Sequence, residues 1–243
     1  MKKPLIGLLA MLASGTLAAA PQINVGGLYD YLHGERSTLL KRVRNSGDST
    51  AFVKVSVFEL VYDAQGNITE VPQDDLPVAQ RPLIASPARL IVPASGLQSM
   101  RLLYRGERDR ERYFRLRFMP VVPERGDGFA ISEEEAQLYG RALNASIEIL
   151  TGYGSLLFVP PKDVTYRTEV SREDHQFTVQ NAGSGTVVLD HFNDCDASGK
   201  ECATVTKHHV RPGTGRPFPL VAGRVYRFEL IEGEQSRRVE VKG

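Results

Sequence analysis

Residues 112–119 read RYFRLRFM, and this stretch points to the fold class because its side chains alternate strictly in character. Phe114, Leu116 and Phe118 fall on one parity, and Arg115 and Arg117 fall on the other. Successive side chains of a β-strand point to opposite faces, so this period of two is typical of a half-buried strand and not of a helix. The stretch predicts a strand with one buried and one polar face.

Similar strands recur along the chain. They are predicted at 53–61 (VKVSVFELV), 88–93, 98–104 (QSMRLLY) and 143–151 (LNASIEILT). Turn signals recur about every 8–12 residues, a spacing typical of β-sandwiches. One segment differs: 132–141 (SEEEAQLYGR) is predicted to be a loop or short helix, with Ser132 and Glu135 in a capping box.

The N-terminus has the pattern of an export signal. Lys2 and Lys3 precede an apolar stretch at 5–17, which ends in three alanines at 18–20. The stretch is too short to span a bilayer, so residues 1–20 are predicted to be a cleavable signal peptide. The alternative is an N-terminal membrane anchor. No later segment approaches 18 uninterrupted apolar residues, so no membrane insertion is expected.

The net charge of the chain argues against binding to nucleic acid or to an anionic membrane. The 243 residues carry 30 Lys and Arg against 29 Asp and Glu. Removing Lys2 and Lys3 leaves 28 against 29, a formal charge of −1. No global field would attract nucleic acid or an anionic membrane, so neither is an expected partner.

A proline pair marks the predicted domain boundary. The sequence VPPK at 159–162 would halt a strand and stiffen a linker. The prediction is an N-terminal domain at 21–160 and a smaller C-terminal sandwich at 163–243. Within the second domain, 224–231 and 237–241 flank Glu232-Gly233-Glu234, which indicates a β-hairpin.

The only two cysteines, Cys195 and Cys202, lie seven positions apart around a Ser198-Gly199 turn signal. In an exported protein this spacing favours a disulfide across a hairpin. A metal-binding or redox pair is the alternative, although the CxxC spacing is absent.

No catalytic motif is present. The chain has no nucleophile elbow, no phosphate-binding glycine loop and no zinc-helix motif. We therefore expect no catalytic activity, no cofactor and no ATP binding. His208 and His209 would point to opposite faces of a strand. A metal site that uses His191 near Cys195 is conceivable, but surface histidines beside a disulfide hairpin are the favoured interpretation.

The ordered set of features resembles the PapD-like periplasmic chaperones of chaperone–usher pili, in the branch of the E. coli common pilus and the CFA/I-like systems. The stretches that carry this resemblance are 23–26 (INVG), 37–41 (STLLK), 45–49 (NSGDS), 86–94 (SPARLIVPA) with Arg101, 111–115 (ERYFR), and 199–202 (GKEC) with Cys195. The resemblance implies an all-β chain of two immunoglobulin-like β-sandwich domains. It also implies two partners, a pilus subunit (pilin) and an outer-membrane usher.

The resemblance implies a mechanism of strand addition. The chaperone inserts its own strand into a subunit that lacks one, so that backbone hydrogen bonds and alternate apolar side chains fill the open groove. Leu143, Ala145, Ile147 and Ile149 form such an apolar face, and the resemblance implies that they are the donor strand. The alternative is an ordinary strand whose apolar face belongs to the chain's own core.

The chain departs from the family at one place. Well-known members hold the subunit's C-terminal carboxylate with an arginine and a lysine, but Tyr29 and Leu156 align with those two positions. The candidates for a replacement anchor are Lys41, Arg115 and Arg101, and each is equally consistent with an ordinary strand cation. Arginine binds a carboxylate in a bidentate geometry.

Two other classes of protein remain open from the sequence. A secreted pilus subunit or adhesin would need a disordered donor extension at its mature N-terminus, whereas the chain here becomes strand-like from Ile23 onward. A secreted enzyme or metal-binding sandwich would need a convergent set of acid, base or ligand residues.

Overall fold

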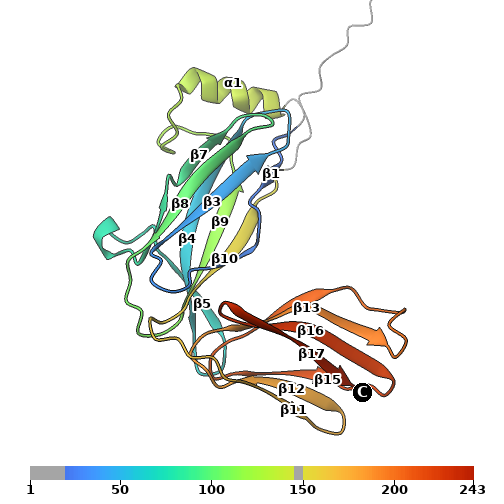
Figure 1. Cartoon of the computed structure of the whole chain (residues 1–243). Coiled ribbons are helices and arrows are strands. Elements are labelled where there is room, and N and C mark those ends of the chain that lie inside the picture. Colours follow the sequence, from blue (N-terminus) through green and yellow to red (C-terminus); the bar gives the residue numbers. More distant parts are fainter. Residues whose placement is uncertain (1–19, 145–149) are drawn as a thin grey trace, which may run out of the picture.

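The computed structural model describes residues 20–144 and 150–243, and these form mostly β-strands (Figure 1). The first part of the chain contains two sheets. Sheet 1 has four strands in the order β1 (Ile23–Asn24), β3 (Thr38–Asn45), β8 (Leu97–Tyr104) and β6 (Leu83–Ser86). Sheet 2 has the order β2 (Tyr29–Tyr31), β10 (Tyr153–Val159), β9 (Arg112–Pro120), β4 (Ala51–Tyr62) and β5 (Ile68–Pro72), with β7 (Arg89–Val92) also paired to β4.

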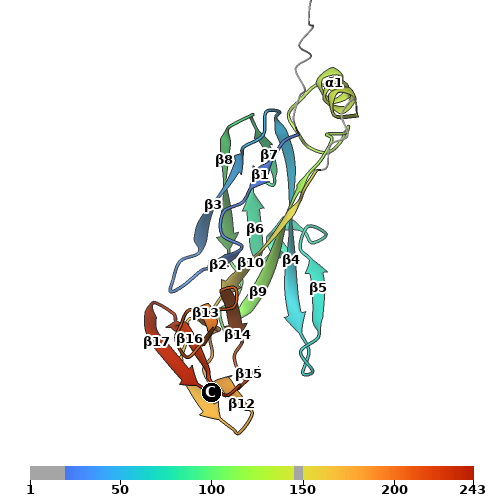
Figure 2. The same ribbon diagram turned by 90° about the vertical axis from the view of Figure 1, so that its right-hand side faces the viewer.

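Sheets 1 and 2 form a sandwich. Inward-facing residues of both sheets, among them Met100, Leu102, Phe114 and Leu116, belong to one buried hydrophobic cluster. Figure 2 shows β3 and β8 on one side of this sandwich and β4 and β5 on the other. The alternation predicted for 112–119 is confirmed, because the inward side chains of β9 are fully buried and Arg115 faces the other way.

The second part of the chain repeats this architecture on a smaller scale. Sheet 3 comprises β11 (Thr168–Arg172), β12 (Gln176–Asn181) and β15 (Gly215–Pro219). Sheet 4 comprises β14 (Thr206–Val210), β13 (Val187–Asp196), β16 (Arg224–Glu232) and β17 (Gln235–Lys242). Their cluster includes Phe177, Leu189 and Phe228 and shares no residue with the first.

The predicted hairpin at the end of the chain is confirmed. Strands β16 and β17 pair antiparallel up to Glu232 opposite Gln235, which leaves a two-residue turn. Gly233 in this turn has φ +65°, a conformation that glycine adopts without the steric cost of a Cβ. Such turns match the twist of the two strands they join.

Helix α1 (Glu133–Asn144) lies at the end of the first sandwich that is remote from the second (Figure 1). The predicted capping box is present, because Glu135 N–H donates to Ser132 Oγ (3.2 Å) and Ser132 N–H donates to Glu135 Oε2 (2.8 Å). Tyr139 fixes the helix to the sandwich, since its ring packs edge-on against Phe52 and its hydroxyl donates to Thr50 O (2.7 Å). A short 3₁₀ helix, η1 (Val78–Gln80), lies between β5 and β6.

One predicted strand is corrected at its start. The sequence predicts a strand at 143–151, but Leu143 lies in the last turn of α1. Residues 145–149 lie outside the described residues, and the next strand, β10, begins at Tyr153. Within the described ranges, no helix is long and apolar enough to span a bilayer.

Candidate functional site

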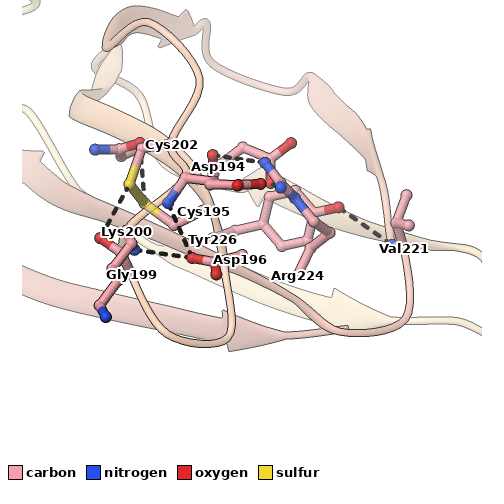
Figure 3. Close-up of polar contacts among 11 residues, drawn as sticks. Asp194, Cys195, Asp196, Gly199, Lys200, Cys202, Val221, Arg224 and Tyr226 are labelled. Carbon is pink, nitrogen blue, oxygen red and sulfur yellow. Dashed lines mark hydrogen bonds and ion pairs between the residues drawn. A yellow bond between two sulfur atoms is a disulfide. The ribbon is translucent and has the colours of Figure 1, made fainter.

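The two cysteines form a disulfide, as predicted (Figure 3). It closes the end of β13, where Asp196 N–H donates to Glu201 O and Asp196 Oδ1 accepts from Lys200 N–H (2.9 Å). Arg224 on the neighbouring strand donates to Asp194 Oδ1 (2.7 Å). The hairpin is thus stabilised covalently and by hydrogen bonds, which indicates a structural role.

The outer face of sheet 2 is the surface on which the two halves of the chain meet. Tyr31 Oη on β2 lies 2.6 Å from His209 Nε2 on β14. The His209 ring also packs on Tyr29 (4.4 Å between centroids) and stacks on Phe158 (4.8 Å). His209 is therefore part of the contact between the two halves of the chain.

Burial sets the protonation of this contact. Desolvation, followed by the nearby Lys207 charge, lowers the pKa of His209 to about 4. Desolvation also raises the pKa of Tyr31 well above its usual range. Near neutral pH the imidazole is uncharged and the phenol keeps its proton, so the Tyr31 hydroxyl donates to an unprotonated His209 nitrogen.

A partly buried carboxylate makes the second contact between the halves. Glu111, in the β8–β9 connection, accepts from Thr186 N–H (2.9 Å) and from Thr186 Oγ1 (2.6 Å). Tyr113 Oη donates to the same carboxylate (2.7 Å). Desolvation raises the pKa of Glu111, although these hydrogen bonds act in the opposite direction. The guanidinium of Arg211 lies 3.6 Å over the Tyr62 ring and adds a third contact.

The two positions aligned with the family's anchoring cations lie side by side. Tyr29 pairs in register with Leu156, and Leu156 pairs in register with Arg115 on β9. Because cross-strand partners share a face, Arg115 lies on the same surface as the expected anchor positions, one strand away. Arg115 and Arg117 both contact Glu70, with Arg117 Nη2 2.6 Å from Glu70 Oε2.

Sequence reasoning missed Arg117. Its guanidinium lies 4.4 Å over the Phe58 ring on the same outer face. The signal was available, because Arg115 and Arg117 share parity in the alternating stretch. Two guanidinium groups and one carboxylate leave a local excess of one positive charge, which could bind a carboxylate from a partner.

The three anchor candidates do not converge. Lys41 faces the core and is only 4% exposed, with Nζ bound to Asp30 Oδ2 (2.6 Å) and Gly27 O (2.5 Å). Arg101 is exposed on the outer face of sheet 1. Arg115 alone of the three lies on the outer face of sheet 2, where the two halves meet.

The predicted donor residues lead into an open strand edge. Leu143 lies in α1, while Ala145, Ile147 and Ile149 lie outside the described residues. The following strand, β10, pairs with β9 along its whole length, but with β2 only from Leu156 to Phe158. On the side away from β9, Tyr153–Ser155 pair with no other strand in the described part of the chain. Unpaired strand edges of this kind accept an added strand.

Metal binding is not indicated by the described residues, in which no group of three or more His, Cys, Asp or Glu side chains is arranged to hold an ion. Asp190 and Glu229 both lie 3.8 Å from His191 Nδ1, and Lys207 also pairs with Asp190 (2.8 Å). The polar contacts around His191 are therefore those of an exposed surface side chain.

The chain is similar to known pilus chaperones along almost its whole length, although no protein-family model matches it. "Probable fimbrial chaperone EcpB" of Escherichia coli O157:H7 (strain EC4115 / EHEC) is 28% identical over 241 residues, which cover 97% of this chain and 98% of the relative. The solved structure of "Class 5 Fimbriae Chaperone CfaA" superposes with a TM-score of 0.55 at 18% identity, covering 91% of this chain and 99% of that one. A chain from the structure of the Salmonella enterica SafA pilin in complex with the SafB chaperone superposes with a TM-score of 0.53 at 13% identity. The match covers 93% of this chain and 97% of that one. Sequence and fold together show that the chain is a homologue of the fimbrial chaperones and has their PapD-like fold.

Proposed function

We propose that the chain is a periplasmic chaperone that binds, folds and caps pilus subunits by donor-strand complementation and delivers them to an outer-membrane usher. The near full-length similarity to fimbrial chaperones supports this role, and the alternative of a structural pilus subunit is not favoured. The observation that carries the mechanism is the open edge of β10 at Tyr153–Ser155, directly after the alternating apolar residues Leu143, Ala145, Ile147 and Ile149.

The proposal includes the organisation of the chain. Residues 1–20 would be removed on export, 21–160 would form the immunoglobulin-like domain with the donor strand, and 163–243 would form the smaller sandwich. Two hydrophobic clusters without a common residue support the division. A strand taken from the chaperone would cover the apolar groove and unpaired edge of a subunit, both of which otherwise favour aggregation.

The donor strand is tested by Ile147→Asp. A charge placed in an apolar pocket of the subunit costs several kcal/mol, so soluble subunit should fall to background on co-expression in a periplasm. The readout is a tagged pull-down of a 1:1 complex with the pilin encoded beside the chain. The matched control is Ser146→Asp, which adds the same charge on the opposite parity and should retain the complex.

Normal subunit recovery with Ile147→Asp would overturn the donor assignment. Loss of the complex with both variants would indicate a general effect of charge in this segment. Circular dichroism and the unfolding midpoint of each purified variant show that the chaperone itself remains folded.

We further propose that Arg115, assisted by Arg117, anchors the subunit's terminal carboxylate in place of the family's cations. Arg115 lies beside Leu156 on the outer face of sheet 2, and the local charge excess favours an anion. Lys41 is already paired within the core, and Arg101 lies on the other sheet.

The anchor is tested by Arg115→Ala combined with Arg117→Ala. We expect subunit recovery to fall about tenfold or more, because a charge-assisted hydrogen bond contributes roughly 1.5–3 kcal/mol. Glu70→Gln is the informative control, since it frees both arginines from their present partner and should preserve or increase recovery. Wild-type recovery from the double variant would exclude these residues, and loss on Arg101→Ala would move the anchor to sheet 1.

A further inference from the structure

The outer face of sheet 1 combines exposed arginines with exposed leucines. Arg42 and Arg44 alternate along β3 and point outward, and Arg101 on β8 is exposed beside them. Leu40 is 52% exposed and pairs in register with Arg101. Leu97 and Leu103, at the two ends of β8, are 50% and 38% exposed.

Within the described residues, the strands of this face carry no compensating negative charge. The four strands of sheet 1 contain no aspartate or glutamate, and within the described residues no ion pair involves Arg42, Arg44 or Arg101. On sheet 2, by contrast, Arg115 and Arg117 share Glu70. Like charges on neighbouring strands repel, so the three unpaired guanidinium groups favour an anionic partner.

The position of the face allows a partner to bind independently of the subunit. Sheets 1 and 2 bury their inner faces in one cluster, so their outer faces point in opposite directions (Figure 2). The outer face of sheet 2 meets the second sandwich through Tyr31 and His209. A subunit bound there would leave sheet 1 uncovered.

We propose that the outer face of sheet 1 is a docking surface for the acidic surface of another protein, with Arg42, Arg44 and Arg101 binding its carboxylates and Leu40 packing between them. Arginine forms bidentate pairs with carboxylates and is enriched at protein interfaces, where it surrounds apolar contacts. Alternate residues of a strand lie about 6.6–6.8 Å apart, so Arg42 and Arg44 would meet separate carboxylates.

An anionic membrane is a less suitable occupant. Surfaces that bind the membrane interface typically combine Lys and Arg with Trp, Tyr or Phe as interfacial anchors. The only aromatic residue on the four strands is Tyr104, which is 3% exposed and faces the core.

The test compares two triple variants that remove equal charge. Arg42→Gln/Arg44→Gln/Arg101→Gln alters the docking surface, and Arg167→Gln/Arg237→Gln/Arg238→Gln removes three exposed arginines of the second sandwich. Binding of the mature protein to a fluorescein-labelled poly-L-glutamate peptide is measured by anisotropy, at low and at near-physiological salt. We expect the first triple variant to bind about tenfold or more weakly and the second to stay within about twofold of wild type.

Other outcomes overturn the proposal. Equal losses in both triple variants would mean that the peptide responds only to net charge. Unchanged peptide binding, with loss of binding to phosphatidylglycerol-containing vesicles in the first variant alone, would assign the face to a membrane. Ile147→Asp should leave peptide binding unchanged, so failure of the donor-strand mechanism and failure of this proposal are distinguishable.

Discussion

At the scale of single residues, each sandwich has a buried asparagine that stabilises a turn through hydrogen bonds. Asn45 is fully buried, and its Nδ2 donates to Ser49 O (2.7 Å) and Val92 O (3.1 Å). Asn181 is also fully buried, and its Nδ2 donates to Gly185 O and Val210 O, both at 2.9 Å. Each side chain satisfies backbone carbonyls at the end of a sheet, where no ladder partner is available.

A glycine two positions after each asparagine completes the arrangement. Gly47 N–H donates to Asn45 Oδ1 (3.0 Å), and Gly183 N–H donates to Asn181 Oδ1 (2.9 Å). A Cβ at Gly47 would lie 2.2 Å from a backbone oxygen, and one at Gly183 would lie 2.4 Å from another. The glycines therefore allow the segment that enters each sandwich to approach the turn closely.

Lys41 is a charged side chain buried in the first sandwich. Its ammonium is almost fully buried and is compensated by Asp30 and a backbone carbonyl. Asp30 lies on β2, at the edge of sheet 2, whereas Lys41 lies on β3 of sheet 1. The ion pair therefore bridges the two sheets at the edge where β2 joins β10.

Breaking this pair from one side should destabilise the chain. Asp30→Asn leaves a buried ammonium without its counter-charge, so we expect a loss of about 3 kcal/mol in the free energy of unfolding. Lys41→Met combined with Asp30→Asn removes both charges and should recover at least half of the loss. Urea denaturation measures both values, and a midpoint unchanged by Asp30→Asn would show that the pair contributes nothing.

The sequence indicates only the direction of the Lys41 side chain, which is offered there as a candidate anchor. Lys41 shares parity with Leu39 and Val43, which predicts an inward side chain whose unpaired charge would be costly. Its partner could not be predicted, because Asp30 reaches that position only through parallel pairing of β2 with β10, more than a hundred residues later. Periodicity within a segment says nothing about which distant segment lies beside it.

At the scale of elements, the clearest error lies where a helix gives way to the predicted donor strand. Residues 133–144 (EEEAQLYGRALN) contain many strong helix formers behind a capping box. The apolar alternation that predicted a strand begins at Leu143, within the last turn of the helix. The two patterns overlap at Leu143, where the structure has the helix.

The disulfide hairpin is an element whose contribution can be measured. Cys195 and Cys202 close a loop with a sequence separation of 7. The chain-entropy relation gives a stabilisation of about 2–3 kcal/mol for so short a loop. Cys195→Ser/Cys202→Ser should therefore lower the free energy of unfolding by about that amount while leaving subunit capture intact. Chemical denaturation in parallel with the pull-down checks this, and lost capture with unchanged stability would instead place the hairpin in the binding site.

At the scale of the whole molecule, several side-chain contacts join the two sandwiches. Glu111 binds Thr186, Tyr31 meets His209, and Arg211 covers a tyrosine ring of β4. None of these pairs was predicted from the sequence, because each joins residues whose proximity depends on the angle between the two sandwiches. The proline pair predicts a domain boundary, but it carries no information about which faces meet.

The Glu111–Thr186 contact should set the orientation of the sandwiches. Thr186→Val removes the hydroxyl donor to Glu111 and keeps the shape and the backbone N–H. A hydrogen bond to a charged group contributes roughly 1.5–3 kcal/mol, so the angle between the sandwiches should become more variable. Small-angle X-ray scattering should then show a broader distribution of interatomic distances. The unfolding midpoint of each core, measured by denaturation, should stay unchanged.

A variable angle between the sandwiches should also weaken subunit capture, because the subunit would bind at the outer face of sheet 2. The outer face of sheet 2 carries the proposed anchor, and the second sandwich bounds that face through the Tyr31–His209 contact. Loss of a fixed orientation reduces the population that is ready to bind, and about 1.4 kcal/mol lowers that population tenfold. Thr186→Val should therefore capture less subunit, whereas the exposed Thr204→Val should behave as wild type. Full capture by Thr186→Val with a broadened scattering profile would mean that the donor strand alone, without the second sandwich, suffices to hold the subunit.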